Sequence, residues 1–406
     1  MKRMYIFLFI LTLSTLLCSC GSDQAPGDSV QTQLQAMVDS KLAAYKKANN
    51  LSNDAGVLVY LVSPRGTWTV SAGSAAGAGA GSHYRIASVT KTFTSAAIML
   101  LDQQGKLDIT KHVTDLIPGT DIPYLPDTPG YQLPYKNQIT LKHLLSHRSG
   151  VFDVSNDPVP ADKNVPYAGK NYLQYIIYDL KDPLHQFTFD ELVGVNSLNG
   201  LSYWMPDFDY HYSNTGFSLL AKIIERVSGK SYDRFITENF FTPMGLTHTS
   251  APWNSNDRKL PSPYVKGYIR TDSTTQLVEA SEDNMSANVA EGNIISTPAD
   301  AARWMRMLLS GMGPLNKEQI TRMTTKPAGN TSYALGLAVS ELGIGHTGAH
   351  LGYMNYVVYN PADDVTVVVV IPFIDYNSIN EQAALIMDLT KEARKAAGYT
   401  AVWPTQ

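Results

Sequence analysis

The sequence predicts an α+β fold: an antiparallel β-sheet flanked by helices, with a mostly helical lobe inserted between the two parts of the chain that form the sheet. Two observations lead to this prediction. Strand pairs are indicated near both ends of the chain, and helical patterns fill the middle. The 406 residues are 44% hydrophobic and 17% charged, so the chain can bury a large core and wholesale disorder is excluded.

A helix and a hairpin are expected first. Apolar residues at spacings of three and four indicate an amphipathic helix packed on one face, formed by Leu34, Met37, Val38, Leu42 and Tyr45. Residues 56–62 and 67–70 then have the composition of two strands. The sequence Ser63-Pro64-Arg65-Gly66 between them is typical of a turn, so we expect a hairpin here.

The middle and the end of the chain complete the pattern. Residues 89–104 are apolar on nearly all sides and stop at Gly105, which predicts a buried central helix with a glycine C-cap. Near the end, strands over 353–359 and 365–371 flank a turn at 360–364, and a helix is expected over 380–397. The two ends therefore share one architecture, which indicates one sheet.

The first residues predict export. Lys2 and Arg3 precede an apolar stretch over 4–17, which is shorter than the ~20 residues that a membrane-spanning helix needs, so residues 1–19 are expected to be a signal peptide. The sequence Leu17-Cys18-Ser19-Cys20-Gly21 resembles the bacterial lipoprotein box, which makes Cys20 the expected lipidation site. The alternative is plain secretion with cleavage nearby.

The expected organisation follows from these features. After the signal peptide comes a flexible tether over 20–30, then one domain over 31–397 whose helical lobe spans roughly 105–300. We expect an exported lipoprotein in the cell envelope, periplasmic or associated with the outer membrane, which contacts the membrane through its lipid only. Cleavage at Cys20 leaves no second cysteine, which excludes disulfides. With 32 basic and 36 acidic residues, the charge is too balanced to indicate a nucleic-acid partner.

The first candidate motif is Ser88-Val89-Thr90-Lys91, at the start of the predicted central helix. Residues three apart lie one turn apart on the same face, so the Lys91 amine can reach the Ser88 hydroxyl. A partly desolvated amine has a lowered pKa and can take the serine proton. The helix N-terminus adds a backbone N–H where an oxyanion would form. The motif therefore predicts a nucleophile, against the common alternative of a helix N-cap and a solvated lysine.

Tyr-x-Asn is the second motif, and it occurs at Tyr135, Tyr212 and Tyr353. We favour Tyr212-Ser213-Asn214, because it directly precedes the helical pattern of residues 215–224, which would hold both side chains at a loop edge. Tyr135 lies in a Pro-rich loop, and Tyr353 lies in a predicted strand, where packing is the expected role.

The third motif is His346-Thr347-Gly348, just ahead of the last hairpin. A small residue at Gly348 would let a substrate backbone lie against the strand edge. His346 and Thr347 offer hydrogen bonds to that substrate.

The order of these three motifs resembles the serine DD-peptidase and class C β-lactamase superfamily, the penicillin-recognising enzymes. The resemblance covers most of the chain and implies the β-lactamase/transpeptidase-like fold. Four further segments look like segments of this family: 84–87, 105–107, 144–150 and 292–300. Within the family, His-Thr-Gly resembles the D-alanyl-D-alanine carboxypeptidases and some esterases, whereas class C β-lactamases usually carry Lys at that position.

The resemblance implies acyl transfer. Ser88 would attack a carbonyl carbon, Lys91 and Tyr212 would share general base and acid roles, and Asn214 would orient Lys91 and the substrate amide. Which of the two takes the first proton is left open. The N–H groups of Ser88 and Ala349 would form the oxyanion hole. No metal or organic cofactor is implied.

The resemblance favours a D-alanyl-D-alanine carboxypeptidase that acts on peptidoglycan stem peptides. Family members commonly place a cation on the strand before the His-Thr-Gly motif, but residues 333–340 contain none. A protonated His346 could serve instead. The missing cation leaves an esterase or a class C-like β-lactamase as the alternative, so the expected substrate is a small peptide, an ester or a β-lactam. A third alternative is a penicillin-binding sensor that does not hydrolyse its ligand.

Three other patterns are weaker. His143 and His147 are spaced as two metal ligands on one helix face, but the Glu of a His-Glu-x-x-His zinc motif is absent, so no metal site is expected. Gly229-Lys230-Ser231 resembles the end of a phosphate loop, but the required first Gly is absent. The aromatic residues within 152–210 could line the pocket or pack the helical lobe; they include Tyr167, Tyr172, Tyr175, Tyr178, Tyr203 and Trp204.

Overall fold

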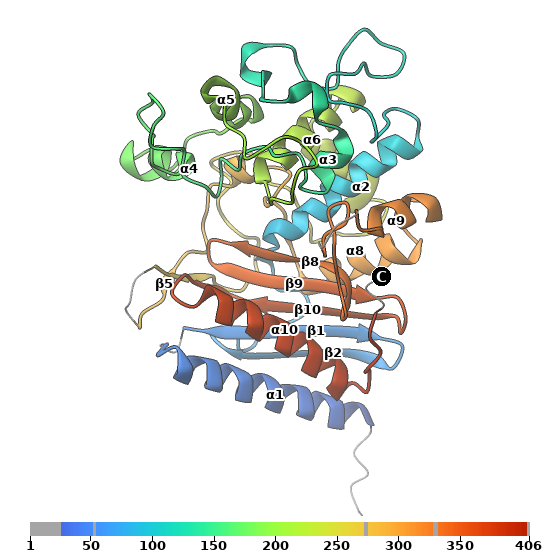
Figure 1. The fold of residues 1–406 in the computed structure, drawn as a ribbon. Coiled ribbons are helices and arrows are strands. Elements are labelled where there is room, and N and C mark those ends of the chain that lie inside the picture. The colour runs from blue at the N-terminus through green and yellow to red at the C-terminus, as the bar shows by residue number, and fades with distance from the viewer. Residues whose placement is uncertain (1–25, 52–53, 272–274, 328–331, 404–406) are drawn as a thin grey trace, which may run out of the picture.

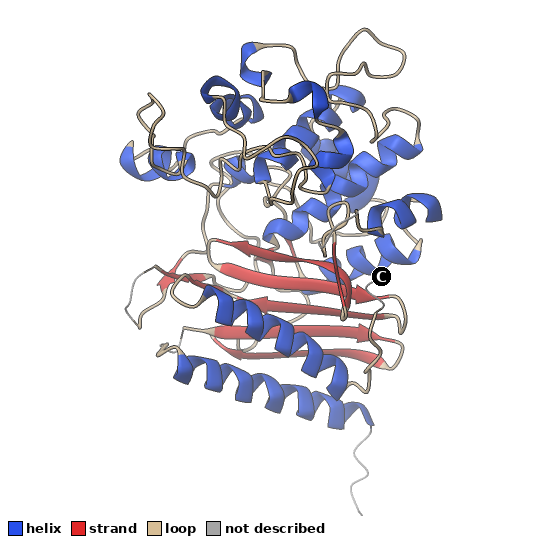
Figure 2. Cartoon of the chain, viewed as in Figure 1, coloured by secondary structure: helices blue, strands red, loops and turns tan. Residues whose placement is uncertain are grey.

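The computed structural model describes residues 26–51, 54–271, 275–327 and 332–403. Its central element is a six-stranded antiparallel sheet in the order β2-β1-β10-β9-β8-β7 (Figures 1 and 2). The strands are β1 (Gly56–Ser63), β2 (Gly66–Gly73), β7 (Ala338–Ser340), β8 (Gly343–His350), β9 (Tyr353–Asn360) and β10 (Val365–Ile371). The first and last parts of the described chain therefore form one sheet, which confirms the predicted fold class.

Both predicted hairpins are present. β1 pairs with β2 through Ser63 and Gly66, so the turn is the predicted Pro64-Arg65 pair. β9 pairs with β10. Every residue of β10 is buried, because helices cover both faces of the sheet at this strand.

The helices α1 (Pro26–Ala48) and α10 (Ile379–Ala396) lie side by side on one face of the sheet (Figure 1). A hydrophobic core fills the space between them and the strands, with Leu34 and Val38 from α1 and Leu389 from α10. α1 begins at Pro26, so the last residues of the predicted tether are helical. The signal peptide and Cys20 lie outside the described residues.

The other face of the sheet meets α8 (Pro298–Ser310) and the helical lobe. The lobe is built around α2 (Thr90–Gln103), which is buried from Thr90 to Leu101 and is followed by Gly105 at φ +67°, as predicted. The remaining helices of this part are α3 (Leu141–Leu145), α4 (Tyr172–Gln174), α5 (Phe189–Asn199), α6 (Asn214–Ser228), α7 (Tyr232–Ile236) and α9 (Lys317–Thr324).

Short strands join the lobe to the sheet region. β3 (Tyr84–Arg85) pairs with β6 (Ile295–Ser296), which brings the segment before Ser88 beside the segment after residue 290. A small sheet of β11 (Phe373–Asp375), β4 (Tyr268–Arg270) and β5 (Val278–Glu279) was not predicted. Within the described ranges, none of the helices combines the length and the apolar character that crossing a bilayer requires.

Candidate active site

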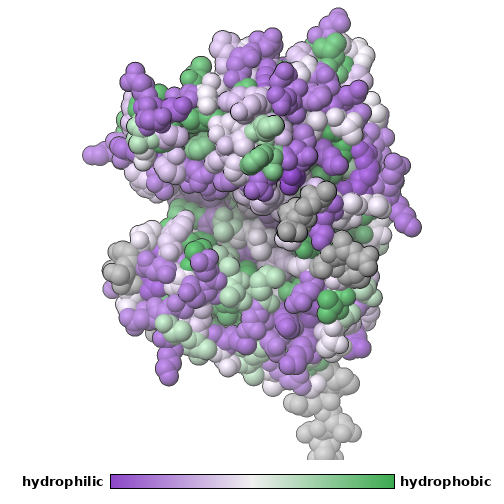
Figure 3. Space-filling view, in the orientation of Figure 1, coloured by the Kyte–Doolittle hydropathy of each residue, from purple (hydrophilic) through white to green (hydrophobic). Residues whose placement is uncertain are grey.

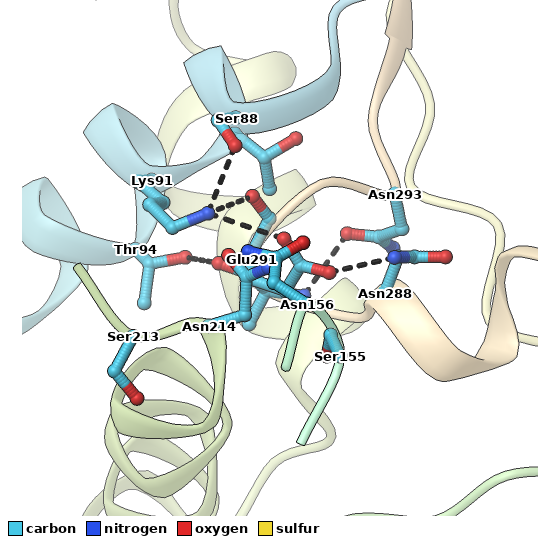
Figure 4. Close-up of polar contacts among 12 residues, drawn as sticks. Ser88, Lys91, Thr94, Ser155, Asn156, Ser213, Asn214, Asn288, Glu291 and Asn293 are labelled. Atoms are coloured by element: carbon cyan, nitrogen blue, oxygen red, sulfur yellow. Dashed lines mark hydrogen bonds and ion pairs between the residues drawn. The ribbon is translucent and has the colours of Figure 1, made fainter. Parts of the chain in front are cut away.

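Ser88 lies in the 3₁₀ turn η1 (Ala87–Val89), directly before α2. The residue before it, Ala87, has φ +49°, a left-handed conformation that costs energy for a residue with a side chain. Lys91 follows one turn later and is fully buried. Its Nζ atom lies 3.0 Å from the Ser88 Oγ atom (Figure 4). The structure thus brings the two residues of the first motif together.

Glu291 is the second partner of Lys91, and the sequence analysis missed it. The Lys91 Nζ atom donates to the Glu291 backbone oxygen at 2.7 Å and to its Oε2 atom at 3.1 Å. Burial lowers the pKa of Lys91 below its usual value, and the Glu291 carboxylate acts in the opposite direction. In the sequence, Glu291 is marked only as a single acidic residue among small and apolar neighbours, in Val289-Ala290-Glu291-Gly292.

Tyr212 lies just before α6, and its ring centroid is 4.9 Å from the Lys91 Nζ atom. Its hydroxyl is buried and completes no hydrogen bond with the described residues. Burial raises the pKa of Tyr212 well above its usual value, while the nearby Ser88 hydroxyl lowers it. The other two Tyr-x-Asn motifs lie elsewhere: Tyr135 is about half exposed in a loop, and Tyr353 donates to the Val265 oxygen inside the core.

Asn214 is the first residue of α6, and its backbone N–H donates to the Asp153 Oδ2 atom at 3.1 Å. The Asn214 Oδ1 atom is buried without a partner in the described part of the chain. The expected bond from this oxygen to Lys91 is therefore absent, and its hydrogen-bonding capacity is left for another group. Burial raises the pKa of Asp153 to about 6.

The third motif lies on β8, which runs past the nucleophile. A Cβ atom at Gly348 would lie 2.2 Å from the Ile86 backbone oxygen. The glycine is thus required for β8 to approach the segment that carries Ser88, which differs from the substrate contact that the sequence suggested. Asn355 stabilises this contact between the two segments, because its Nδ2 atom donates to the Ile86 oxygen at 3.1 Å. Ser88, Thr347 and Ala349 consequently line one cavity.

His346 is buried and neutral. Its Nε2 atom is 2.8 Å from the Tyr333 hydroxyl, and its Nδ1 atom is 2.5 Å from the Thr347 backbone oxygen. Because the backbone oxygen can only accept, Nδ1 carries the hydrogen and Nε2 accepts from Tyr333. Burial and the nearby Lys91 charge lower the pKa of His346 to about 3. His346 therefore cannot supply the positive charge that the sequence analysis considered for binding a substrate carboxylate.

The two histidines considered as metal ligands have structural partners. His143 closes a capping box with Thr140 at the start of α3. His147 packs against the Tyr212 ring at 4.1 Å, and its Nδ1 atom accepts from the Ser213 N–H. Burial lowers the pKa of His147 well below its usual value, so it is neutral. Across the described residues, no cluster of His, Cys, Asp and Glu side chains is arranged to hold a metal ion.

The cavity has a volume of about 510 Å³ and lies between the helical lobe and the sheet, where the molecular surface is hollowed (Figure 3). Side-chain amides form much of its polar lining, from Asn156, Asn171, Gln174, Asn214, Asn284 and Asn288. Its apolar lining comes from Leu173, Ile177, Tyr178, Leu351, Ile374, Tyr376 and Ile379. His350 on β8 also lines it, and its Nε2 atom is 2.5 Å from the Asp283 Oδ2 atom.

Of the aromatic residues singled out within 152–210, Tyr178 lines this cavity. Four others pack instead against a small hydrophobic core of the lobe: Tyr167, Tyr172, Tyr175 and Tyr203. Both expected roles therefore occur, on different residues.

The chain is similar to known proteins in sequence and in fold. The family model described as Beta-lactamase matches residues 46–372. Protein flp of Staphylococcus aureus (strain MRSA252) is 26% identical over 303 residues, which is 70% of this chain and 52% of that protein. The chain thus spans about half the length of this relative.

Two solved structures are similar in fold. The D-stereospecific amidohydrolase from Streptomyces sp. has a TM-score of 0.69 and 23% identity, over 84% of this chain and 94% of that one. The D-amino acid amidase from Ochrobactrum anthropi SV3, complexed with L-phenylalanine amide, has a TM-score of 0.67 and 20% identity, over 90% and 99%. At this level of identity, the similarity shows a shared fold.

Proposed function

The chain belongs to the Beta-lactamase family, and we propose that it is a serine hydrolase that cleaves amide bonds of small D-amino-acid compounds through an acyl-enzyme on Ser88. The observation that carries this proposal is the 3.0 Å contact between the Lys91 Nζ and Ser88 Oγ atoms beside the cavity. A serine hydroxyl becomes a strong nucleophile when a base takes its proton, and burial makes the Lys91 amine such a base.

Acylation begins when Lys91 takes the Ser88 proton and the Ser88 Oγ atom bonds to the substrate carbonyl carbon. The backbone N–H groups of Ser88 and Ala349 would stabilise the oxyanion, with about 3 kcal/mol from each donor. Tyr212 is a neutral phenol because its pKa is raised. It therefore acts as the acid, and it donates its proton to the leaving amine as the amide bond breaks.

Deacylation uses the same groups in reverse. The Tyr212 phenolate takes a proton from water, and the resulting hydroxide attacks the acyl carbon. Lys91, which is now an ammonium ion, returns its proton to the Ser88 Oγ atom as the ester bond breaks. The protons in this cycle therefore pass between Ser88, Lys91, Tyr212, the substrate and water.

The cavity lining supports an amide substrate without a carboxylate group. The basic side chains that line the cavity are His346, which is neutral, and His350, which is paired with Asp283; Lys91, buried behind the lining, is paired with Glu291. A substrate carboxylate would thus meet no unpaired cation among the described lining residues, whereas the side-chain amides suit peptide and amide groups. The names of the two structural neighbours, an amidohydrolase and an amidase for D-amino acids, agree with this substrate class.

D-alanyl-D-alanine carboxypeptidase activity on peptidoglycan stem peptides is the second candidate. It is favoured by His350, which lines the cavity at the end of β8 and would bind a terminal carboxylate if it exchanged Asp283 for the substrate. This exchange has to break a 2.5 Å hydrogen bond, and we therefore rank this candidate below the amidase.

The test compares hydrolysis of a D-amino acid amide, D-alanine release from an N-acylated D-Ala-D-Ala peptide, hydrolysis of a short-chain ester and hydrolysis of a cephalosporin. We expect the amide to be the best substrate and Ser88→Ala to abolish its turnover. Turnover of the ester or the cephalosporin alone would contradict the amidase proposal, and faster release of D-alanine would favour the carboxypeptidase. A Ser88→Ala variant as active as the wild type would contradict both.

For the cell location, we propose an envelope lipoprotein held by lipid on Cys20. This proposal rests on the N-terminal sequence alone. Labelled palmitate should be incorporated into the wild type and not into Cys20→Ser. Equal labelling of both would contradict it.

A further inference from the structure

A buried carboxylate contacts the catalytic amine. The Glu291 side chain is 4% exposed and the Lys91 side chain is 0% exposed, with the charged atoms 3.1 Å apart. Two buried charges are expensive unless each finds good partners. Acyl transfer by Ser88 and Lys91 does not by itself require Glu291, so the position of this carboxylate calls for an explanation.

The contacts of Lys91 suggest one. Its Nζ atom has three oxygen neighbours: the Glu291 backbone oxygen at 2.7 Å, Glu291 Oε2 at 3.1 Å and Ser88 Oγ at 3.0 Å. A neutral amine has two hydrogens and one lone pair. When Glu291 accepts both hydrogens, the lone pair is left for the Ser88 hydroxyl. Glu291 thus orients the amine for proton transfer.

Glu291 is itself held firmly in place. Its Oε1 atom accepts from the Asn288 Nδ2 atom at 2.6 Å. The preceding residue, Ala290, has φ +70°, and its carbonyl oxygen accepts from Thr94 on α2 at 2.6 Å. A non-glycine residue in the left-handed region persists where its surroundings enforce it, and such strain concentrates at functional sites. Ala87, before Ser88, shows the same feature.

We propose that Glu291 is a positioning residue for acyl transfer: it holds the Lys91 amine toward Ser88 and offsets the positive charge that Lys91 gains. In the assisted step, the O–H bond of Ser88 breaks, an N–H bond forms on Lys91, and the electron pair on Oγ bonds to the substrate carbonyl carbon. The inference rests on the proposed function, in which Ser88 is the nucleophile.

Other titratable groups also face Lys91. Asp153 and the Tyr212 ring interact with Lys91, and the Lys91 charge also acts on His147 and His346, which are neutral. The Asp153 carboxylate accepts from the Asn214 N–H and from Asn156 Nδ2, so it is held away from the amine. Among the described residues, Glu291 is the carboxylate in hydrogen-bond contact with Lys91.

The test follows the rate of Ser88 labelling by an aryl fluorophosphonate as a function of pH, because this reagent reports on the serine hydroxyl whatever the natural substrate is. Labelling requires neutral Lys91, so its rate rises with pH through the Lys91 pKa. The Glu291 carboxylate raises that pKa. In Glu291→Gln the rise should move about 1 to 2 pH units lower, and the plateau rate should fall roughly tenfold because the amine is oriented less well.

Glu291→Asp is the matched variant that keeps the charge but shortens the side chain. It should retain the wild-type pH profile while the plateau rate falls several-fold. Asp363→Asn, which breaks an ion pair in the β9–β10 turn outside the cavity lining, is the control for the loss of a carboxylate and should change neither quantity. A merely structural role for Glu291 predicts an unchanged plateau rate for every folded variant.

A Glu291→Gln profile that coincides with the wild type would overturn the inference. If Glu291→Gln does not fold, Glu291→Asp decides, and an unchanged plateau rate in that variant would overturn it. Both results leave the proposed function standing, because the wild type is still labelled at Ser88. A wild type that is not labelled at Ser88 would overturn the proposed function and the inference with it.

Discussion

Two buried ion pairs of the structure have different surroundings. Lys91–Glu291 lies beside the cavity, and Glu291 contributes to its lining. Arg394–Asp363 lies at the β9–β10 turn, where the guanidinium donates to both oxygens of Asp363 and to the Ala401 backbone oxygen. Both pairs are largely buried, with side-chain exposures of 0% and 4% in the first and 3% and 12% in the second.

The difference lies in the polar atoms nearby. Around Lys91, three buried polar atoms have no partner among the described residues: the Tyr212 hydroxyl, Asn214 Oδ1 and His147 Nε2. Close to Arg394 and Asp363 in the chain, the buried Tyr399 hydroxyl and Thr366 Oγ1 also have no partner among the described residues, but neither of them lines the cavity. A buried polar group without a partner costs free energy, and a bound substrate can recover it by supplying the missing hydrogen bond. The comparison teaches that burial alone does not identify a catalytic pair, whereas unsatisfied polar atoms that line a cavity beside it do, as Tyr212 and Asn214 show.

The largest effect is expected for Lys91→Met, which removes the amine of the pair at the cavity. We expect kcat/KM to fall by about a thousandfold or more, because the base for Ser88 is lost. Stability should fall less than catalysis, since Glu291 borders the cavity and keeps its hydrogen bond from Asn288. Steady-state kinetics beside a thermal unfolding curve checks this. A variant that keeps a tenth of the wild-type rate would exclude Lys91 as the base.

Asp363→Asn should produce the opposite outcome. It leaves the Arg394 guanidinium without its counter-charge, and the free energy of unfolding should fall by about 3 kcal/mol. Activity per folded molecule should stay at the wild-type level. Denaturant unfolding gives the first quantity and active-site titration the second. A specific loss of activity would show that the β9–β10 turn is coupled to the active site.

Tyr212→Phe removes the unpartnered hydroxyl and keeps the ring against Lys91. We expect kcat to fall by roughly a hundredfold through loss of the general acid. Stability should be unchanged or slightly higher, because a buried hydroxyl without a partner is removed. A large drop in stability with unchanged kcat would show that the hydroxyl is structural.

The smallest effect is expected for His346→Gln, and it is a change in how stability depends on pH. The pKa of His346 is about 3 in the folded protein, and about 6.5 when unfolded. Below about pH 6.5, the His346 side chain is protonated in the unfolded chain but stays neutral in the folded chain. The free energy of unfolding therefore falls as the pH drops. The free energy of unfolding of the variant should fall less steeply than that of the wild type, by about 1 kcal/mol less per pH unit over this pH range. Equal losses in urea unfolding at two pH values would contradict the buried, neutral state of His346.

Local patterns in the sequence predict much of the fold. The alternation and turn residues at 63–66 and 360–364 predict both hairpins, and Gly105 ends the central helix. Such features depend on neighbours in the chain. The small sheet of β4, β5 and β11 escaped prediction because β4 and β5 are only 3 and 2 residues long and β4 pairs with a strand about a hundred residues away.

The residues of the site likewise form two groups: those that local sequence patterns predict and those that only the fold brings together. Ser88 and Lys91 are joined by helical spacing, which the sequence displays. Glu291 is 200 residues from Lys91 along the chain, so that only the folded chain brings their side chains together. The pairing of His350 with Asp283 and the role of Gly348 in strand packing depend likewise on tertiary contacts.

The most direct test of the central claim, a serine acylated with the help of Lys91, is the mass of the protein quenched during turnover of an activated ester of a D-amino acid. The account predicts a gain of one acyl group on the peptide that contains Ser88, slower formation in Glu291→Gln, and no adduct in Ser88→Ala. An adduct on another residue, or turnover by Ser88→Ala at the wild-type rate, would contradict it.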